Sequence, residues 1–157
     1  MIDDLLHILT VSAALGCGLI AGVFFAFSSF VMKALARLPP PVGLAAMQSI
    51  NVVVLNRSFL GLFLGTAVAC VVLAASALLW WGEPAAIYRL AGSALYLAGS
   101  LGVTGAFHVP RNVALATADP DGADGASRWA KYVGPWTVAN HVRAAAALGA
   151  AALFTIA

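Results

Sequence analysis

The polar side chains best suited to chemistry are concentrated between residues 108 and 143. This stretch contains two imidazoles, two carboxamides and a guanidinium: His108, Asn112, Asn140, His141 and Arg143. An imidazole can accept a proton near neutral pH, and a guanidinium or carboxamide can hold an oxygen on which negative charge develops. We therefore expect a reaction centre or ligand site here, with His141, Arg143 and Asn140 as its candidate catalytic residues.

Each of these residues also has a structural interpretation. Arg143 lies inside an apolar run, so it either snorkels to the headgroups or faces the protein and binds a carbonyl, phenolate or other anion. His141 is either a general base or a structural histidine bonded to a backbone carbonyl. No cofactor is predicted. A metal or haem held by His108 and His141 is the alternative, and the sequence suggests no third ligand for it.

Helical spacing groups these side chains. Asn140 and Arg143 are three residues apart and share a helical face with Trp136, whereas His141 points about 100° away from Asn140. Residues 42–58 also carry amides, among them Asn51 and Asn56. We expect this segment either to lie as an interfacial helix or to line the mouth of the site. The predicted ligand-binding set is therefore His108, Asn112, Asn51, Asn56 and Trp136.

The elements that position these residues are membrane helices. The chain has 157 residues, of which 62% are hydrophobic and 9% charged, whereas soluble domains carry about 25% charged residues. Four apolar runs reach the roughly 20 residues that cross a bilayer, at about 5–31, 59–81, 85–107 and 138–157. The predicted fold is all-α: one domain, 1–157, forming a four-transmembrane-helix bundle with short cytoplasmic interfacial helices.

Breaks between the helices follow from proline and glycine. Three prolines at 39–41 stop the first helix, and a bend is required near residues 56–58. Pro110 should end or kink the third span at His108, and residues 134–135 should break a short helix before the fourth span. The large aromatic residues beside that break are predicted to form an interfacial belt: Trp129, Tyr132 and Trp136.

Charge distribution predicts the orientation. Basic residues gather in the connections after the first and third spans, so these long loops should be cytoplasmic and both termini outside. The net charge of +2 without a basic stripe does not indicate nucleic acid. The expected partners are membrane lipids. Small-residue motifs, Gly18 with Gly22 and Gly61 with Gly65, favour close helix packing and allow a homo-oligomer.

Several runs resemble the anthrone oxygenase-like family of small four-helix membrane proteins: GCGLIAGVFFAFSSFVM, AAMQSINVVVLN, FHVPRN and W-x-x-x-NHVR. They cover nearly the whole chain in matching order. The matched polar positions are Asn51, Asn56, Asn112, Asn140, His141 and Arg143. His108 stands where an asparagine is expected in this family, and Val113 and Ala139 are further departures.

The resemblance implies a four-span integral membrane protein and, for a few fungal relatives, oxygenation of anthrones to anthraquinones. Most relatives are bacterial, so the expected location is the bacterial inner membrane. In that chemistry His141 would take a proton and Arg143 or Asn140 would hold a phenolate-like oxygen. We therefore predict binding or cofactor-independent oxidation of an apolar aromatic or quinone-like molecule near the cytoplasmic face. The alternative is a non-catalytic oligomeric module for assembly, lipid binding or structural support. A transporter ranks third, because few polar residues lie mid-membrane.

Overall fold

A computed structural model describes residues 2–157, and every regular element in that range is helical. The all-α prediction is confirmed. The first long rod consists of α1 (Ile2–Ala26), the π-helical turn η1 (Phe27–Val31) and α2 (Met32–Ala36), followed by α3 (Pro40–Val53) and α4 (Arg57–Leu79). The next rod consists of α5 (Ala86–Ala94), two π-helical stretches, η2 (Leu95–Gly102) and η3 (Thr104–His108), and α6 (Val109–Ala116). The last helix is α7 (Gly125–Thr155).

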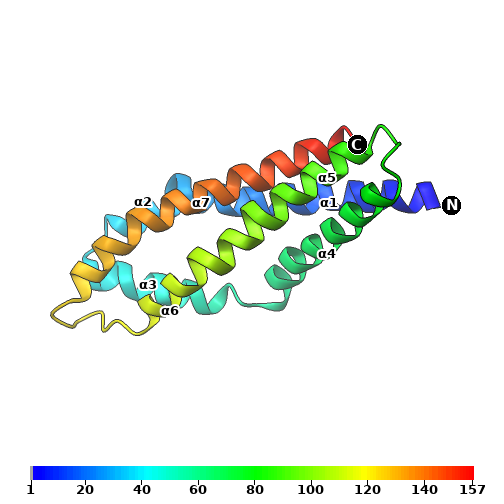
Figure 1. Cartoon of the computed structure of the whole chain (residues 1–157). Coiled ribbons are helices and arrows are strands. Elements are labelled where there is room, and N and C mark those ends of the chain that lie inside the picture. The colour runs from blue at the N-terminus through cyan, green and yellow to red at the C-terminus, as the bar shows by residue number, and fades with distance from the viewer. Residues whose placement is uncertain (1) are drawn as a thin grey trace.

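The long helices form a bundle in which α7 packs along α1 and also contacts α5 and η2 (Figure 1). Both termini lie at one end of the bundle, together with the α4–α5 turn; we call this the terminal end. The short helices α3 and α6 and the loop before α7 lie at the other end, which we call the loop end. Both termini therefore lie at one end of the bundle and the long connections at the other, as the sequence predicted.

Three of the described helices are long and apolar enough to cross a membrane. They are Ile2–Ala36, Arg57–Leu79 and Ala86–Ala116. Many large apolar side chains on their surfaces are exposed, for example Leu15, Phe25 and Val68, which suits a lipid environment. The fourth expected span, within α7, is not among these three; Asn140, His141 and Arg143 make that helix less apolar.

The chain breaks near α3 agree with the prediction. The first rod ends at Ala36, and α3 starts on the prolines at Pro40. Between α3 and α4, the Asn56 side chain accepts a hydrogen bond from the Phe59 backbone N–H at 2.9 Å. This is an N-cap, which satisfies an amide that the first turn of α4 leaves free.

At Pro110 the helix changes type where the break was predicted: the π-helical stretch η3 ends at His108 and α6 begins at Val109, although the rod from Ala86 to Ala116 stays helical. The break predicted at residues 134–135 is wrong, because α7 continues through Pro135. An interior proline costs about 3 kcal/mol, and burial of one large side chain stabilises by roughly 1.5–3 kcal/mol, so the buried aromatics around Pro135 can offset it.

The predicted aromatic belt is also wrong. Trp129, Tyr132 and Trp136 are 4%, 6% and 4% exposed. They pack in a core cluster with Leu44 and Met47 of α3 instead of facing the interface. Their burial fixes α3 against α7 at the loop end.

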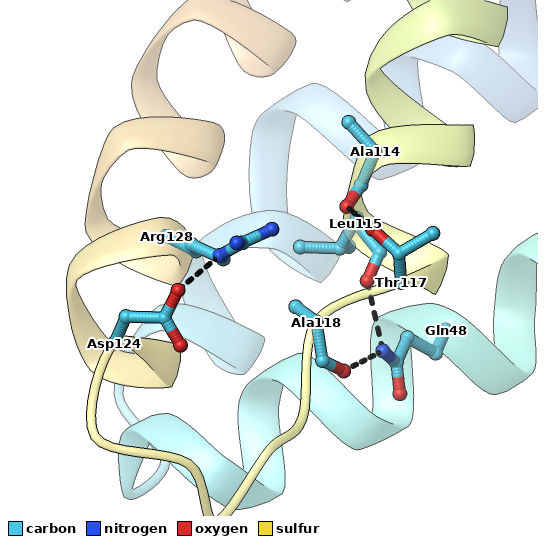
Figure 2. Close-up of polar contacts among 7 residues, drawn as sticks. All are labelled: Gln48, Ala114, Leu115, Thr117, Ala118, Asp124 and Arg128. Atoms are coloured by element: carbon cyan, nitrogen blue, oxygen red, sulfur yellow. Dashed lines mark hydrogen bonds and ion pairs between the residues drawn. The ribbon is translucent and has the colours of Figure 1, made fainter.

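Gln48 secures α3 to the end of α6. Its side-chain amide donates hydrogen bonds of 2.8 and 2.9 Å to the carbonyl oxygens of Leu115 and Ala118 (Figure 2). These carbonyls lie at the helix C-terminus, where intrahelical donors are lacking. Figure 2 also shows the pair of Arg128 and Asp124 at the start of α7; this hydrogen bond holds the pKa of the Asp124 carboxyl below its ordinary value.

Close packing within the bundle uses glycines outside the predicted motifs. A Cβ built on Gly99 would lie 2.5 Å from the Cβ of Ala146 on α7. A Cβ on Gly16 would overlap Thr66 of α4, and one on Gly92 would lie 2.9 Å from the Phe154 ring. At the predicted motif positions, Gly18, Gly22, Gly61 and Gly65, a Cβ meets nothing within 4 Å. These two motifs therefore face outward from the chain's own interior.

Candidate functional site

A buried polar cluster joins three rods around Arg143, which is 6% exposed. Its NH1 group donates to the hydroxyl of Thr104 at 3.0 Å, and NH2 donates to the side-chain oxygen of Asn140. The amide nitrogen of Asn140, itself fully buried, donates to the Phe24 carbonyl at 2.6 Å and to the Ser28 hydroxyl. We call these residues, with His108 and Trp136, the Arg143 cluster.

Among residues 2–157, no carboxylate forms an ion pair with the guanidinium of Arg143. The chain's six acidic residues all lie outside the apolar runs. Its Nε is buried and has no hydrogen-bond partner. Arginine is effectively always protonated, and a charge within a span is expensive and usually serves a function. A buried, unpaired cation with a free donor is suited to an anion or a polarised oxygen.

Aromatic rings form the walls around this cation. The central guanidinium carbon lies 4.0 Å from the ring centroid of Phe24 and 5.6 Å from that of Trp136. Phe24 packs in turn edge-on against Phe63, with centroids 6.2 Å apart. Cation–π contacts stabilise a desolvated cation by about 2 kcal/mol, and the same ring faces would pack well against a planar aromatic ligand.

His108 is the second buried ionisable group of the cluster, at 1% exposed. Its ring stands at 85° to Trp136, with centroids 5.0 Å apart, and also packs edge-on against Phe107. Nδ1 lies 3.4 Å from the Val103 carbonyl oxygen, whereas Nε2 is buried without a hydrogen-bond partner. Trp136 is therefore flanked by both the imidazole and the Arg143 guanidinium.

The sequence did not reveal several members of this cluster. Phe24 and Ser28 lie in α1 and η1, and Thr104 lies in η3 with His108. The π-helical stretches η1 and η3 thus supply polar side chains to the cluster, and such stretches frequently mark functional sites. The i, i+4 spacing of Thr104 and His108 was the available signal, because residues at this spacing are neighbours on a helix surface.

A second polar group lies next to the first, towards the loop end. The Asn112 side-chain oxygen accepts hydrogen bonds from the Tyr132 hydroxyl at 2.8 Å and from the Trp136 indole N–H at 3.1 Å. Asn51 of α3 lies near the same Tyr132 hydroxyl, and its amide nitrogen is buried without a partner. Trp136 thus links this group directly to the Arg143 cluster.

Two predicted site residues lie elsewhere. His141 is exposed and lines a groove of about 400 Å³ between α1 and α7, which we call the His141 groove. Its other lining residues are Gly18, Ala21, Gly22, Phe25, Ala144, Ala145 and Leu148. Asn56 is exposed and acts as the N-cap of α4. The structure therefore brings Arg143, Asn140, His108 and Trp136 together, with Asn112 and Asn51 alongside, and separates His141 and Asn56 from them.

Metal-ligand chemistry has little support in this geometry. Among residues 2–157, no group of three histidine, cysteine or acidic side chains could hold a metal ion. His108 is buried against Phe107 and Trp136, whereas His141 is exposed and lines the His141 groove. Cys17 and Cys70 are buried free thiols, which behave as small hydrophobic side chains.

Comparison with known proteins gives one family. The model of the family described as anthrone oxygenase matches residues 54–153, a range that includes Thr104, His108, Asn112, Asn140 and Arg143. No curated protein and no solved structure matches significantly.

Proposed function

The chain belongs to the anthrone oxygenase family, and from this premise we propose that it binds and oxidises an apolar, oxygen-bearing aromatic molecule within the membrane. The proposed site is the Arg143 cluster. Candidate substrates are anthrones and related phenols or hydroquinones, which are planar, partition into lipid and carry an oxygen that can take up negative charge.

The observation that carries this proposal is the buried Arg143 guanidinium, which has a free Nε and no carboxylate partner in the part of the chain that the structure describes. A purely structural role would favour a paired or neutral side chain, because an unpaired charge is expensive inside a span. A ligand oxygen bearing partial negative charge would accept from Nε and be stabilised most strongly when it becomes an oxyanion. Thr104 and Asn140 hold the guanidinium in place for this task.

The proposed reaction needs only a base, an oxyanion partner and dioxygen. Removal of a proton from the central CH₂ of an anthrone leaves its electron pair in the ring system, as a phenolate held by Arg143. The carbanion then reacts with dioxygen. One oxygen atom replaces both hydrogens as the new carbonyl, and the other leaves as water, which balances anthrone plus dioxygen against anthraquinone plus water. Dioxygen and the substrate both dissolve in the bilayer.

The proposed membrane arrangement adds α7 as a fourth span. α7 has 31 residues, about 46 Å at 1.5 Å per residue, and packs along α1. Its polar side chains Asn140 and Arg143 are buried in the bundle, so they need not meet lipid. The basic loop end then lies on the cytoplasmic side of a bacterial inner membrane, and the site lies close to this cytoplasmic face. Labelling of a cysteine introduced at Ala157 with an impermeant maleimide in intact cells would support this; labelling only after lysis would contradict it.

The direct test is turnover by the purified protein. In detergent or nanodiscs, the wild type should consume dioxygen and convert anthrone to anthraquinone faster than protein-free lipid does. Arg143→Met should lose this activity, whereas Arg128→Met, which changes an exposed arginine, should keep it. A wild type no faster than Arg143→Met and lipid alone would refute the proposal.

A second candidate function is an oligomeric, non-catalytic membrane module. The observation that favours it is that Gly61 and Gly65, like Gly18 and Gly22, face outward and leave room for another helix. The double variant Gly61→Leu, Gly65→Leu should then reduce the oligomer to a monomer in analytical ultracentrifugation. A wild type that is already monomeric in several detergents would contradict this function.

A further inference from the structure

We propose that His108, through Nε2, is the proton acceptor of the Arg143 cluster. This inference rests on the proposed function and assigns its base to the buried imidazole rather than to His141. Because His108 stands where the family is expected to have an asparagine, the assignment is specific to this chain. It also narrows the substrate to aromatics that present an acidic C–H or O–H together with an oxygen that can accept from Arg143.

The surroundings of His108 favour one ring nitrogen as the base. Nδ1 lies 3.4 Å from the Val103 carbonyl oxygen. A carbonyl oxygen can only accept, so this contact favours the neutral tautomer with the proton on Nδ1 and the lone pair on Nε2. Nε2 is buried without a partner, and the ring is held edge-on by Trp136 and Phe107. A fixed lone pair in a buried place is what a base requires before substrate binds.

Arg143 supplies the complementary group. The free Nε of Arg143 is a donor, and the free Nε2 of His108 is an acceptor. Both side chains lie beside Trp136: the guanidinium carbon is 5.6 Å and the imidazole centroid 5.0 Å from the centroid of its ring. Unpaired buried donors and acceptors are rare in folded proteins. A ligand that donates a hydrogen to His108 and accepts from Arg143 would satisfy both. The charged groups nearest His108 are Arg143 of α7 and Arg111 of α6, and neither can act as a competing base.

The proton-transfer step is balanced. The substrate C–H or O–H bond breaks, its proton forms an N–H bond at Nε2, and the electron pair stays on the substrate as an anion whose oxygen Arg143 holds. His141 cannot share this geometry, because it lies two residues from Arg143, about 200° around α7, and lines the His141 groove. It serves as the competing candidate in the test.

The experiment compares three histidine-to-asparagine variants. Asparagine keeps polar hydrogen bonding and cannot accept a proton at neutral pH. His108→Asn should lower kcat for anthrone oxidation by about 10²–10⁴-fold, the usual contribution of a general base, with KM changed much less. His141→Asn is the rival variant, and His7→Asn, an exposed position in α1, is the control expected to match wild type. Thermal unfolding of each variant reports folding.

A binding readout separates proton transfer from stability. The probe is a hydroxyanthraquinone, whose visible absorption moves to longer wavelength when its phenol ionises. Bound to wild type, the probe should show the ionised spectrum at neutral pH; bound to His108→Asn it should show the neutral one. His108→Gln is the second variant if the asparagine form is poorly folded, and it should behave in the same way.

The possible outcomes test the role of His108 separately from the proposed anthrone oxidation. Turnover lost in His108→Asn and kept in His141→Asn supports the assignment. Turnover kept in His108→Asn, or lost in His141→Asn alone, overturns it and leaves the proposed function standing. A wild type that neither oxidises anthrone nor binds the probe overturns both.

Discussion

Replacing Arg143 by methionine separates binding from stability. Methionine has a similar length and is apolar, so it removes the charge without leaving a large void. The variant loses the hydrogen bonds to Thr104 and Asn140 and the contact with the Phe24 ring. It also removes a buried cation that lacks a carboxylate partner within the described chain.

These effects oppose each other in the free energy of unfolding. A buried acceptor left without its donor, here the Asn140 side-chain oxygen, costs about 1–3 kcal/mol. Replacing a buried charge by an apolar group of similar volume is often neutral or stabilising by about 1–4 kcal/mol. We therefore expect the free energy of unfolding to change by no more than about 3 kcal/mol in either direction. A ligand oxygen, in contrast, loses a charge-assisted hydrogen bond worth about 1.5–3 kcal/mol, which raises Kd roughly 10- to 150-fold.

The assay is titration of the purified protein with a quinone while tryptophan fluorescence is followed. Trp136 lies beside the site, so a bound quinone should quench it. Arg128→Met serves as the matched control. If Arg143→Met lowers the free energy of unfolding by more than about 3 kcal/mol yet the variant binds quinone like wild type, the guanidinium is structural and this reasoning is refuted.

Three further substitutions test the packing of the bundle. Asn140→Leu should destabilise by about 2–4 kcal/mol in denaturant unfolding, because it removes three hydrogen bonds from a fully buried position; a change below about 1 kcal/mol would contradict the geometry. Gly99→Leu should destabilise by at least about 1–3 kcal/mol, because a side chain there meets Ala146, whereas Gly65→Leu should leave the unfolding midpoint unchanged; equal effects would refute the packing. Gln48→Leu should speed proteolysis in the loop before α7, because the carbonyls that it caps lose their donor, and an unchanged cleavage rate would argue against that role.

The membrane character and the helix segments could be predicted because they depend on local composition. Apolar runs, the prolines at 39–41 and the need for a break before Arg57 are all visible in the sequence. So was the shared face of Asn140 and Arg143, whose side chains bond to each other as their spacing requires. The outward direction of His141 from that face follows from the same helical geometry.

The rest depends on contacts between distant segments. Ser28 lies 112 residues from Asn140, and Thr104 lies 39 residues from Arg143, so no local pattern could pair them. Pro135 lies within a continuous helix because of tertiary packing around Trp136, which local propensity does not contain. The GxxxG motifs were visible, but only the three-dimensional arrangement shows that Gly99 packs inside while Gly65 faces out.

The most direct measurement is mass spectrometry of the small molecules that co-purify with the protein in mild detergent. Wild type should carry an oxygen-bearing aromatic, such as an anthraquinone, phenol or quinone, at near-stoichiometric amounts, and Arg143→Met purified in parallel should carry about tenfold less or none. Lipid alone on both proteins, or the same aromatic at equal occupancy on both, would contradict the claim that Arg143 forms the binding site.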